Sequence, residues 1–482
     1  MKVLIAASEA VPYAKTGGLA DVVGALLKEH RKAGREAYLF LPLYRGIKER
    51  FSLEDTGRKV TVPIGGRRIS GRIFSHEGVA FFVECDEFFG RSELYGTPEG
   101  DYADNSSRFI FFDRAVLEAC KALGLRPDVI HCNDWQTGLL PLYLKTIYSS
   151  DFFRGTVTLM TVHNLGYQGL FEARDYALTG LPPELFNPEG PEFYGKVNFL
   201  KAGLIGAEII TTVSETYARE ILTAEFGSGL EGVLMKRASD LHGVLNGIDY
   251  EEWDPGRDSL IDSVYSPSDL SGKASCKRAL LKECSFSGND RKAPVMALVG
   301  RLSAQKGLDI LVEAADDIVS MGAKIIILGR GEEEIHKSVT AAAGRHKGRI
   351  FLKVGYDESF AHRIYAGSDM FLMPSIYEPC GLGQLAAMRY GGLPVARRTG
   401  GLADTVEEYE PLKGLGTGFL FDDYRAGSLR ECVRLAMCAY TDTARWNGLL
   451  RRAMEKDFSW GSSARKYYGL YKAALARKRR QL

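Results

Sequence analysis

Residues 369–406 constrain the fold of this chain more than any other stretch. They hold two short apolar runs, residues 370–373 and 393–396, and each run is followed by a loop and then by a helix-forming segment with glycines at the turns. Short apolar runs bounded by Pro and Gly are typical of buried strands. A repeated strand–loop–helix order predicts a parallel α/β sheet that binds anions at helix N-termini.

Glu378 comes directly after the first of these strands and just before Gly381. Ligands of parallel sheets bind at the carboxyl ends of the strands, and a carboxylate there can accept hydrogen bonds from sugar hydroxyls. The other interpretation is that Glu378 caps the helix that starts near Gly381, since acidic residues are favoured in first turns. The segment alone leaves both interpretations open.

A glycine loop near the N-terminus repeats a loop of this stretch. Residues 15–21 read KTGGLAD and residues 398–404 read RTGGLAD, so only the cation differs. Two such loops far apart predict two similar α/β domains, each of which offers backbone amides and a cation to one anionic ligand. Chance similarity of two glycine loops is the alternative. Lys15 is either a solvated loop lysine or, as its place before two glycines favours, a phosphate ligand.

Length and composition limit the class of protein. A chain of 482 residues is too long for one ordinary core, so two domains are expected. A net charge of +1 and a pI near 7.6 argue against a nucleic-acid partner and against a polybasic membrane protein. The eight cysteines show no CxxC or His/Cys cluster, which predicts neither a zinc site nor a disulfide framework. The first apolar run is a strand rather than a signal peptide, no segment reaches transmembrane length, and we expect a cytoplasmic protein.

Polar residues follow several further strands of the first half. Asn133 and Asp134 follow the strand that ends at Cys132, and His163 follows the strand at 157–162. Because parallel strands end at one sheet edge, these side chains are expected to meet there. The polar and aromatic segment 95–105, which begins at Tyr95, has the composition of a sugar-contacting loop or of an ordinary surface loop.

The second half opens with an apolar strand at 294–299, followed at once by Arg301 and Lys306. The forked guanidinium of an arginine and the compact charge of a lysine together suit the binding of a diphosphate. The alternative is that both cations are solvated and bind no ligand. We place the domains at 1–241 and 242–459, with an amphipathic helix from residue 460 that packs back on the first domain.

These motifs together resemble bacterial glycogen synthases and plant starch synthases over essentially the whole chain. The motifs that carry the resemblance are KTGGL at 15–19, NDW at 133–135, TVHN at 161–164, LNGID at 245–249, Arg301 to Lys306, and EPCGL at 378–382. The resemblance implies a GT-B fold, an α/β fold with two Rossmann-like domains, a cleft between them and a C-terminal helix that returns to the N-terminal domain. It implies transfer of glucose from ADP-glucose to the non-reducing 4-OH of an α-1,4-glucan with retention, and neither a metal nor another cofactor.

The family's site residues carry over by position. Arg301, Lys306, Lys15 and the Gly18 amide would hold the diphosphate, and Glu378 and His163 would contact the glucose. Asp134 and Asn246 would shape the glucose and acceptor site, Tyr95 would lie on the acceptor side, and Tyr356 would stack on the adenine. Further substrate contacts are expected from the neighbours of these motifs: Asp21, Cys380, Gly381 and Leu382.

Two departures from the family pattern bear on the donor. Asn133 stands where many bacterial members have histidine, and Gly383 stands where threonine is usual, so a hydroxyl contact to the phosphates is lost. A related enzyme that uses UDP-glucose or another acceptor is therefore one alternative. A pyridoxal-phosphate phosphorylase and a catalytically silent sugar-nucleotide or glucan-binding protein are two others, and the sequence does not fix the oligomeric state.

Overall fold

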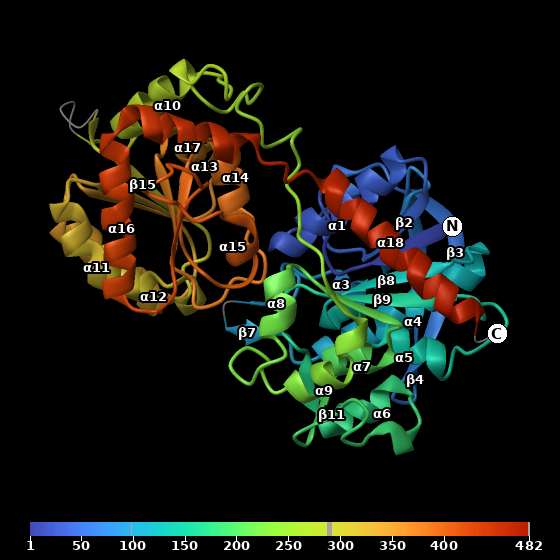
Figure 1. Cartoon of the computed structure of the whole chain (residues 1–482). Coiled ribbons are helices and arrows are strands. Elements are labelled where there is room, and N and C mark those ends of the chain that lie inside the picture. The colour runs from blue at the N-terminus through green and yellow to red at the C-terminus, as the bar shows by residue number, and fades with distance from the viewer. Residues whose placement is uncertain (98, 287–291, 481–482) are drawn as a thin grey trace. The chain divides into compact units, whose positions relative to one another are not determined.

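The computed structural model describes residues 1–97, 99–286 and 292–480, which form two compact units (Figure 1). Unit 1 comprises Met1–Val213, Ala218–Val244 and the C-terminal segment from Trp460, and unit 2 comprises Ser214–Tyr217 and Leu245–Ser459. The division falls after Val244 rather than after residue 241, because the strand β14 (Leu241–Gly243) pairs with the unit 1 sheet.

Unit 1 is built on a nine-stranded sheet of order β14-β13-β9-β8-β1-β2-β5-β4-β3. The pairs from β14 to β5 are parallel, and β3 and β4 add an antiparallel edge. The chain leaves β1 toward β2 on one side and later returns to place β8 on the other side, so the strand order reverses between β1 and β8. The remaining strands of this sheet are β1 (Lys2–Ala6), β2 (Glu36–Pro42), β3 (Glu54–Ile64), β4 (Arg67–His76), β5 (Ala80–Glu84), β8 (Val129–Asn133), β9 (Val157–Val162) and β13 (Ile209–Thr212).

The helices of unit 1 come from both ends of the chain. The last helix, α18 (Trp460–Arg479), lies along α1 (Gly18–Lys32), where Trp460 packs against Val22 and Ala25 (Figure 1). The hydroxyl of Tyr471 in α18 also lies 2.8 Å from Nδ1 of His131 in β8. The C-terminal helix therefore belongs to the core of the N-terminal unit. The other helices are α2 (Ile47–Arg50), α3 (Asp86–Phe89), α4 (Asn105–Leu123), α5 (Leu140–Lys145), α6 (Tyr176–Thr179), α7 (Phe199–Gly206), α8 (Glu215–Glu220, whose first residues group with unit 2) and α9 (Glu231–Lys236).

Two small sheets complete the strands of unit 1. They contain β10 (Leu170–Glu172) with β11 (Glu192–Phe193) and β12 (Lys196–Asn198), and β6 (Gly96–Thr97) with β7 (Gly100–Asp101). The second of them lies within the polar segment that starts at Tyr95.

Unit 2 is a six-stranded, all-parallel sheet of order β17-β16-β15-β18-β19-β20. In chain order this is 3-2-1-4-5-6, the arrangement of dinucleotide-binding sheets, whose ligands bind where the order reverses. The reversal lies between β15 and β18. The strands are β15 (Val295–Val299), β16 (Lys324–Gly329), β17 (Ile350–Val354), β18 (Met370–Met373), β19 (Leu393–Arg397) and β20 (Phe419–Phe421).

Helices cover both faces of this sheet, because its strands alternate their side chains between two apolar layers. Met296 and Leu298 of β15 face one layer with α11, whereas Val295 and Ala297 face the other layer with α13. The helices are α10 (Ser271–Glu283), α11 (Leu308–Ser320), α12 (Glu333–Arg345), α13 (Glu358–Gly367), α14 (Gly383–Arg389), α15 (Gly400–Thr405), α16 (Ala426–Thr441) and α17 (Thr443–Glu455).

The predicted α/β class with two Rossmann-like units and a returning C-terminal helix is confirmed. Among the described residues, no helix combines the length and the apolar composition that a membrane-spanning segment needs.

Candidate active site

The candidate site in unit 2 is formed by the loops that follow β15 and β18, the neighbouring strands between which the strand order reverses. Gly307 closes the short turn Ala304–Lys306 after β15 with a φ of 70°. A Cβ on Gly307 would lie 1.9 Å from the carbonyl oxygen of Pro374, so only glycine lets the two loops approach this closely. This contact brings Lys306 to Glu378.

Lys306 and Glu378 form a largely buried ion pair. Lys306 Nζ donates to Glu378 Oε2 at 2.6 Å, and Ser375 Oγ donates to the same oxygen at 3.0 Å. The side chains are 22% and 7% exposed. Glu378 therefore does not cap α14, whose N-cap residue is Leu382 and has no side-chain cap bond. The capping interpretation of Glu378 is wrong.

The loop of Gly400 and Gly401 packs tightly against the backbone of the loop that follows β18. A Cβ on Gly400 would lie 2.0 Å from the carbonyl oxygen of Glu378, and one on Gly401 would lie 2.1 Å from that of Cys380. Arg398 is held by Glu408 and Asp422. In unit 1, by contrast, a Cβ on Gly17 would meet nothing within 4 Å. The two matching loops thus differ in their surroundings. The loop at Gly400 packs against the backbone that carries Glu378.

Three buried polar atoms near this site have no hydrogen-bond partner among the described residues: Asn246 Oδ1, Ser303 Oγ and Gln384 Oε1. The backbone N–H of Asn246 contacts Cys380, which places Asn246 beside the Glu378 loop. Burial raises the pKa of Cys380 to about 12, so its thiol is not a nucleophile near neutral pH. Unpaired buried polar atoms are costly, and a ligand that bonds to them removes the cost.

The remaining predicted residues of unit 2 lie at the same carboxyl edge. Arg301 is exposed directly after β15, and Tyr356, 76% exposed, follows β17. Gly381 has a φ of 73°, and Leu382 is half-buried at the start of α14.

Gly383, the first residue of α14, faces two aromatic side chains. A Cβ there would lie 2.9 Å from Phe371 Cε1 and 3.5 Å from the hydroxyl of Tyr365. The aromatic rings therefore occupy the space that a larger side chain at this position needs.

In unit 1, the buried carboxylate of Glu9 organises the predicted site, and the sequence analysis did not single it out. Glu9 Oε1 accepts from Thr16 Oγ1 at 2.6 Å and Glu9 Oε2 accepts from the backbone N–H of Gly17 at 3.2 Å, which holds the loop that leads into α1 at Gly18. The Tyr95 hydroxyl lies 2.7 Å from Glu9 Oε1, and burial together with this carboxylate raises the pKa of Tyr95 well above its ordinary value. A signal was present, because Ser8 and Glu9 directly follow the first strand.

Lys15 and Asp21 lie together at the start of α1. Lys15 Nζ is 2.7 Å from Asp21 Oδ1, and both side chains are partly exposed. Asp21 thus holds the lysine that the sequence assigns to a phosphate.

Asp134 and His163 meet at the ends of β8 and β9, as predicted. Asp134 Oδ1 accepts from the backbone N–H of His163 at 2.7 Å, and burial raises the pKa of Asp134 to about 7. Burial lowers the pKa of His163 to about 3, so the ring is neutral near pH 7.

Asn133 sets the tautomer of that ring. Its Nδ2 donates to the carbonyl oxygen of Ala6 at 3.1 Å, so its Oδ1 faces His163 Nε2, 2.9 Å away. An amide oxygen only accepts, so Nε2 carries the proton and Nδ1 the lone pair.

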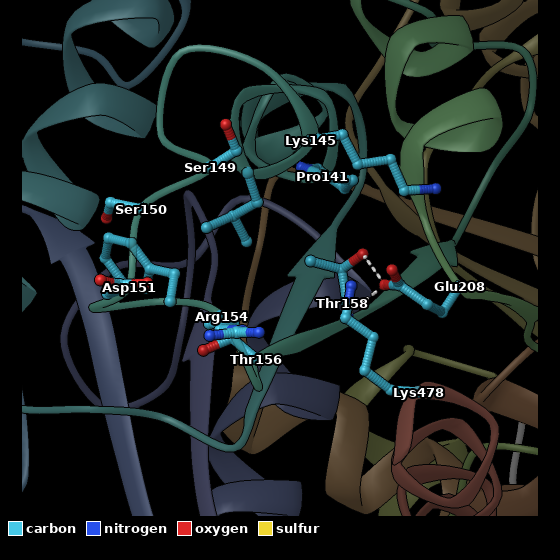
Figure 2. Close-up of a pocket in the computed structure, with 12 residues that line it drawn as sticks. Pro141, Lys145, Ser149, Ser150, Asp151, Arg154, Thr156, Thr158, Glu208 and Lys478 are labelled. Carbon is cyan, nitrogen blue, oxygen red and sulfur yellow. Dashed lines mark hydrogen bonds between the residues drawn. The ribbon is translucent and has the colours of Figure 1, made fainter. Parts of the chain in front are cut away.

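A separate pocket of about 330 Å³ lies at the opposite, amino edge of the unit 1 sheet (Figure 2). Figure 2 shows Thr158, at the start of β9, bonded to the carboxylate of Glu208, with Lys145 and Lys478 on the pocket wall. It contains none of the predicted site residues.

Comparisons with known proteins show which family this chain resembles. The family model "Starch synthase catalytic domain" matches residues 2–236 and "Glycosyl transferases group 1" matches residues 283–446. Glycogen synthases of Thermodesulfovibrio yellowstonii and Geotalea uraniireducens are 43% and 46% identical, over 100% of this chain and 99% and 100% of theirs.

Solved structures give the same result. The catalytic domain of starch synthase IV from Arabidopsis thaliana, bound to ADP and acarbose, superposes with a TM-score of 0.91 at 33% identity over 98% of this chain and 99% of that one. Sucrose-phosphate synthase from Thermosynechococcus elongatus, 17% identical with a TM-score of 0.63 over 99% of both chains, shares the fold. On this evidence the chain belongs to the glycogen and starch synthase family of glycosyltransferases.

Proposed function

We propose that this protein transfers glucose from ADP-glucose to the non-reducing 4-OH of an α-1,4-glucan with retention of configuration, and that it needs no metal or other cofactor. The observation that carries the proposal is the Lys306–Glu378 pair, which lies where the strand order of a Rossmann-like sheet reverses. Support comes from starch synthase IV, whose structure was solved with ADP and acarbose and aligns over nearly the whole chain.

The cations of the site act on the leaving group in this proposal. Departure of ADP from C1 leaves negative charge on the diphosphate, and groups that stabilise charge formed only in the transition state raise the turnover number. Lys306 has three N–H donors and uses one of them on Glu378. Its other donors and the guanidinium of Arg301 then bind phosphate oxygens, and Lys15 of unit 1 serves the same diphosphate.

Glu378 stabilises the sugar rather than attacking it. Its Oε2 is bonded to Lys306 and Ser375, which fixes the orientation of the carboxylate. We infer that the glucan hydroxyl attacks C1 on the side from which ADP leaves and passes its proton to the departing phosphate. The bond from C1 to the phosphate oxygen breaks as the bond from C1 to the acceptor oxygen forms.

The residues of unit 1 orient the sugar. His163, neutral and with its tautomer set by Asn133, presents Nδ1 as an acceptor for a sugar hydroxyl. Asp134 and Asn246 bind further hydroxyls of the glucose and the acceptor, Tyr95 lies on the acceptor side, and Tyr356 stacks on the adenine.

An assay with a glucan primer and either ADP-glucose or UDP-glucose, with and without EDTA, tests the proposal. We expect elongation with ADP-glucose that EDTA leaves unchanged. Free glucose as the product, or no elongation with either donor, contradicts the glucan-synthase proposal. A higher kcat/KM with UDP-glucose would instead support the alternative that Gly383 suggests, since the hydroxyl usual at that position is absent here.

Lys306→Ala isolates the leaving-group step. We expect kcat to fall by about a hundredfold or more, as loss of a preorganised charge does. Lys413→Ala is the matched control, because Lys413 also pairs with a glutamate, Glu410, but at an exposed position. The leaving-group role fails if kcat of Lys306→Ala stays within about twofold of the parent value, with folding checked by circular dichroism.

A further inference from the structure

His362, in α13 of unit 2, is a buried histidine with one unused nitrogen. It is 2% exposed and stacks on Trp253 with ring centroids 4.2 Å apart and an angle of 12°. Nδ1 lies 2.7 Å from Asp258 Oδ2. Nε2 is buried and has no hydrogen-bond partner among the described residues. The carboxylate of Asp258 binds the proton of Nδ1, so the lone pair of the neutral ring resides on Nε2.

Asp258 is itself held in its bonding position. The Tyr390 hydroxyl donates to Asp258 Oδ2 at 2.6 Å. Burial acts to raise the pKa of Asp258, but the hydrogen bonds from His362 and Tyr390 outweigh it and leave the pKa below its ordinary value. A carboxylate that fixes the Nδ1–H of a histidine is the usual second partner of a metal-ligating imidazole.

Two exposed glutamates lie beside His362. One ligand atom each from Glu252, Glu358 and His362 lie within 4.8 Å of one another. Glu358 is four residues before His362 at the start of α13, so both side chains lie on one helix face. Glu252 comes from the loop ahead of Trp253. The buried imidazole of His362 thus has two carboxylates next to it.

We propose that Glu252, Glu358 and His362 bind one divalent transition-metal ion, with His362 coordinating through Nε2. Ligand distances of about 2.0–2.2 Å require ligand atoms about 3.4 Å apart, which the exposed glutamates reach by rotating their side chains. An imidazole with two carboxylates suits Zn²⁺, Fe²⁺ or Co²⁺ better than Mg²⁺ or Ca²⁺. Water fills the remaining positions.

The ion joins α13 to the chain segment that precedes α10, and so stabilises unit 2. Glucosyl transfer as proposed above does not use it. The competing explanation is that the three side chains lie together without an ion, in which case no metal binds.

Zinc titration by calorimetry, with the melting temperature as a second readout, tests the site. The background is Cys438→Ser, because Cys438 is the exposed cysteine among the eight and would bind zinc on its own. We expect one equivalent of Zn²⁺ per chain and a rise in melting temperature.

The double variant Glu252→Gln/Glu358→Gln should raise the Kd for Zn²⁺ by about tenfold or more. These positions are exposed, so the variant is expected to fold, unlike His362→Ala, which would leave a cavity beside Trp253.

Glu332→Gln is the matched control. Glu332 precedes His336 by four residues at the start of α12, as Glu358 precedes His362, and should leave Kd unchanged. Co²⁺ gives a spectroscopic check, since visible absorption bands should appear in the parent and be lost in the double variant. The proposal is overturned if no stoichiometric binding occurs, or if the double variant and Glu332→Gln bind Zn²⁺ as the parent does.

Discussion

At the scale of single residues, Glu378 gives the sharpest prediction. Glu378→Gln keeps the shape and the bond to Ser375 but removes the charge that faces Lys306. Because a sugar ring that gains positive character then loses a negative partner, kcat should fall by about a hundredfold or more, while ADP affinity stays nearly unchanged. Kinetics, ADP titration and a melting curve on one variant separate these effects. Glu410→Gln, which breaks an exposed pair, is the control. Parental kcat in Glu378→Gln would remove Glu378 from the mechanism.

Asp134 predicts a pH dependence of stability. Its folded pKa of about 7 exceeds the ordinary value, so the folded state keeps a proton that the unfolded state loses between about pH 4 and pH 7. The stability that this proton contributes is complete below pH 4 and is lost as pH rises through 7. Asparagine does not ionise, so the melting temperature of Asp134→Asn relative to the parent should increase from pH 4 to pH 7 and then level off. A difference independent of pH would contradict the raised pKa.

Some of these site residues could be predicted from the sequence and others could not, for physical reasons. Lys306 and Glu378 were predictable together because each follows a strand, and strand ends share an edge. Glu9 could have been noticed by its place after the first strand, but no spacing in the sequence encodes its binding to the backbone amides of a loop. The tight packing of the Gly400 loop could not be predicted, since a glycine needed for contact with a neighbouring backbone has the same sequence signature as one that faces a ligand.

At the scale of elements, strand prediction was accurate where apolar runs are fully buried. The strands at 157–162 and 370–373 have the predicted bounds, because parallel strands covered on both faces read as continuous apolar runs. The three-residue strands β10, β12 and β14 have no such pattern, and the domain boundary shifted because β14 was not recognised as a strand.

The start of α14 supplies a prediction at this scale. Gly383→Thr should destabilise the protein by about 1–3 kcal/mol, because the new side chain meets the ring of Phe371. Phe371→Leu makes room, so the double variant should recover part of the loss, and chemical denaturation of the four proteins measures the coupling. Strict additivity of the two changes would show that Phe371 is not the obstacle.

At the scale of the whole molecule, we assign Lys15 from unit 1 and Arg301 from unit 2 to the same donor molecule. This assignment predicts that the two units close when the donor binds. Saturating ADP-glucose should reduce the radius of gyration measured by X-ray scattering, because a ligand bound by both units favours a closed state. Lys306→Ala, with weakened donor binding, should need more ligand for the same change. Superimposable profiles with and without donor would count against a shared ligand.

The place of α18 in the core of unit 1 has a consequence for biosynthesis. Unit 1 is formed by residues from both ends of the chain. The two ends of unit 2 lie side by side, since the N–H of Ile248 donates to the carbonyl oxygen of Phe458 at 2.9 Å. Unit 2 is thus an insertion in the unit that encloses it in sequence. On the ribosome, the synthesis of unit 2 is completed first. Unit 1 cannot complete its core until its final helix, α18, covers Val22 and Ala25. A stop codon just before Trp460 would therefore harm the unit whose synthesis began first.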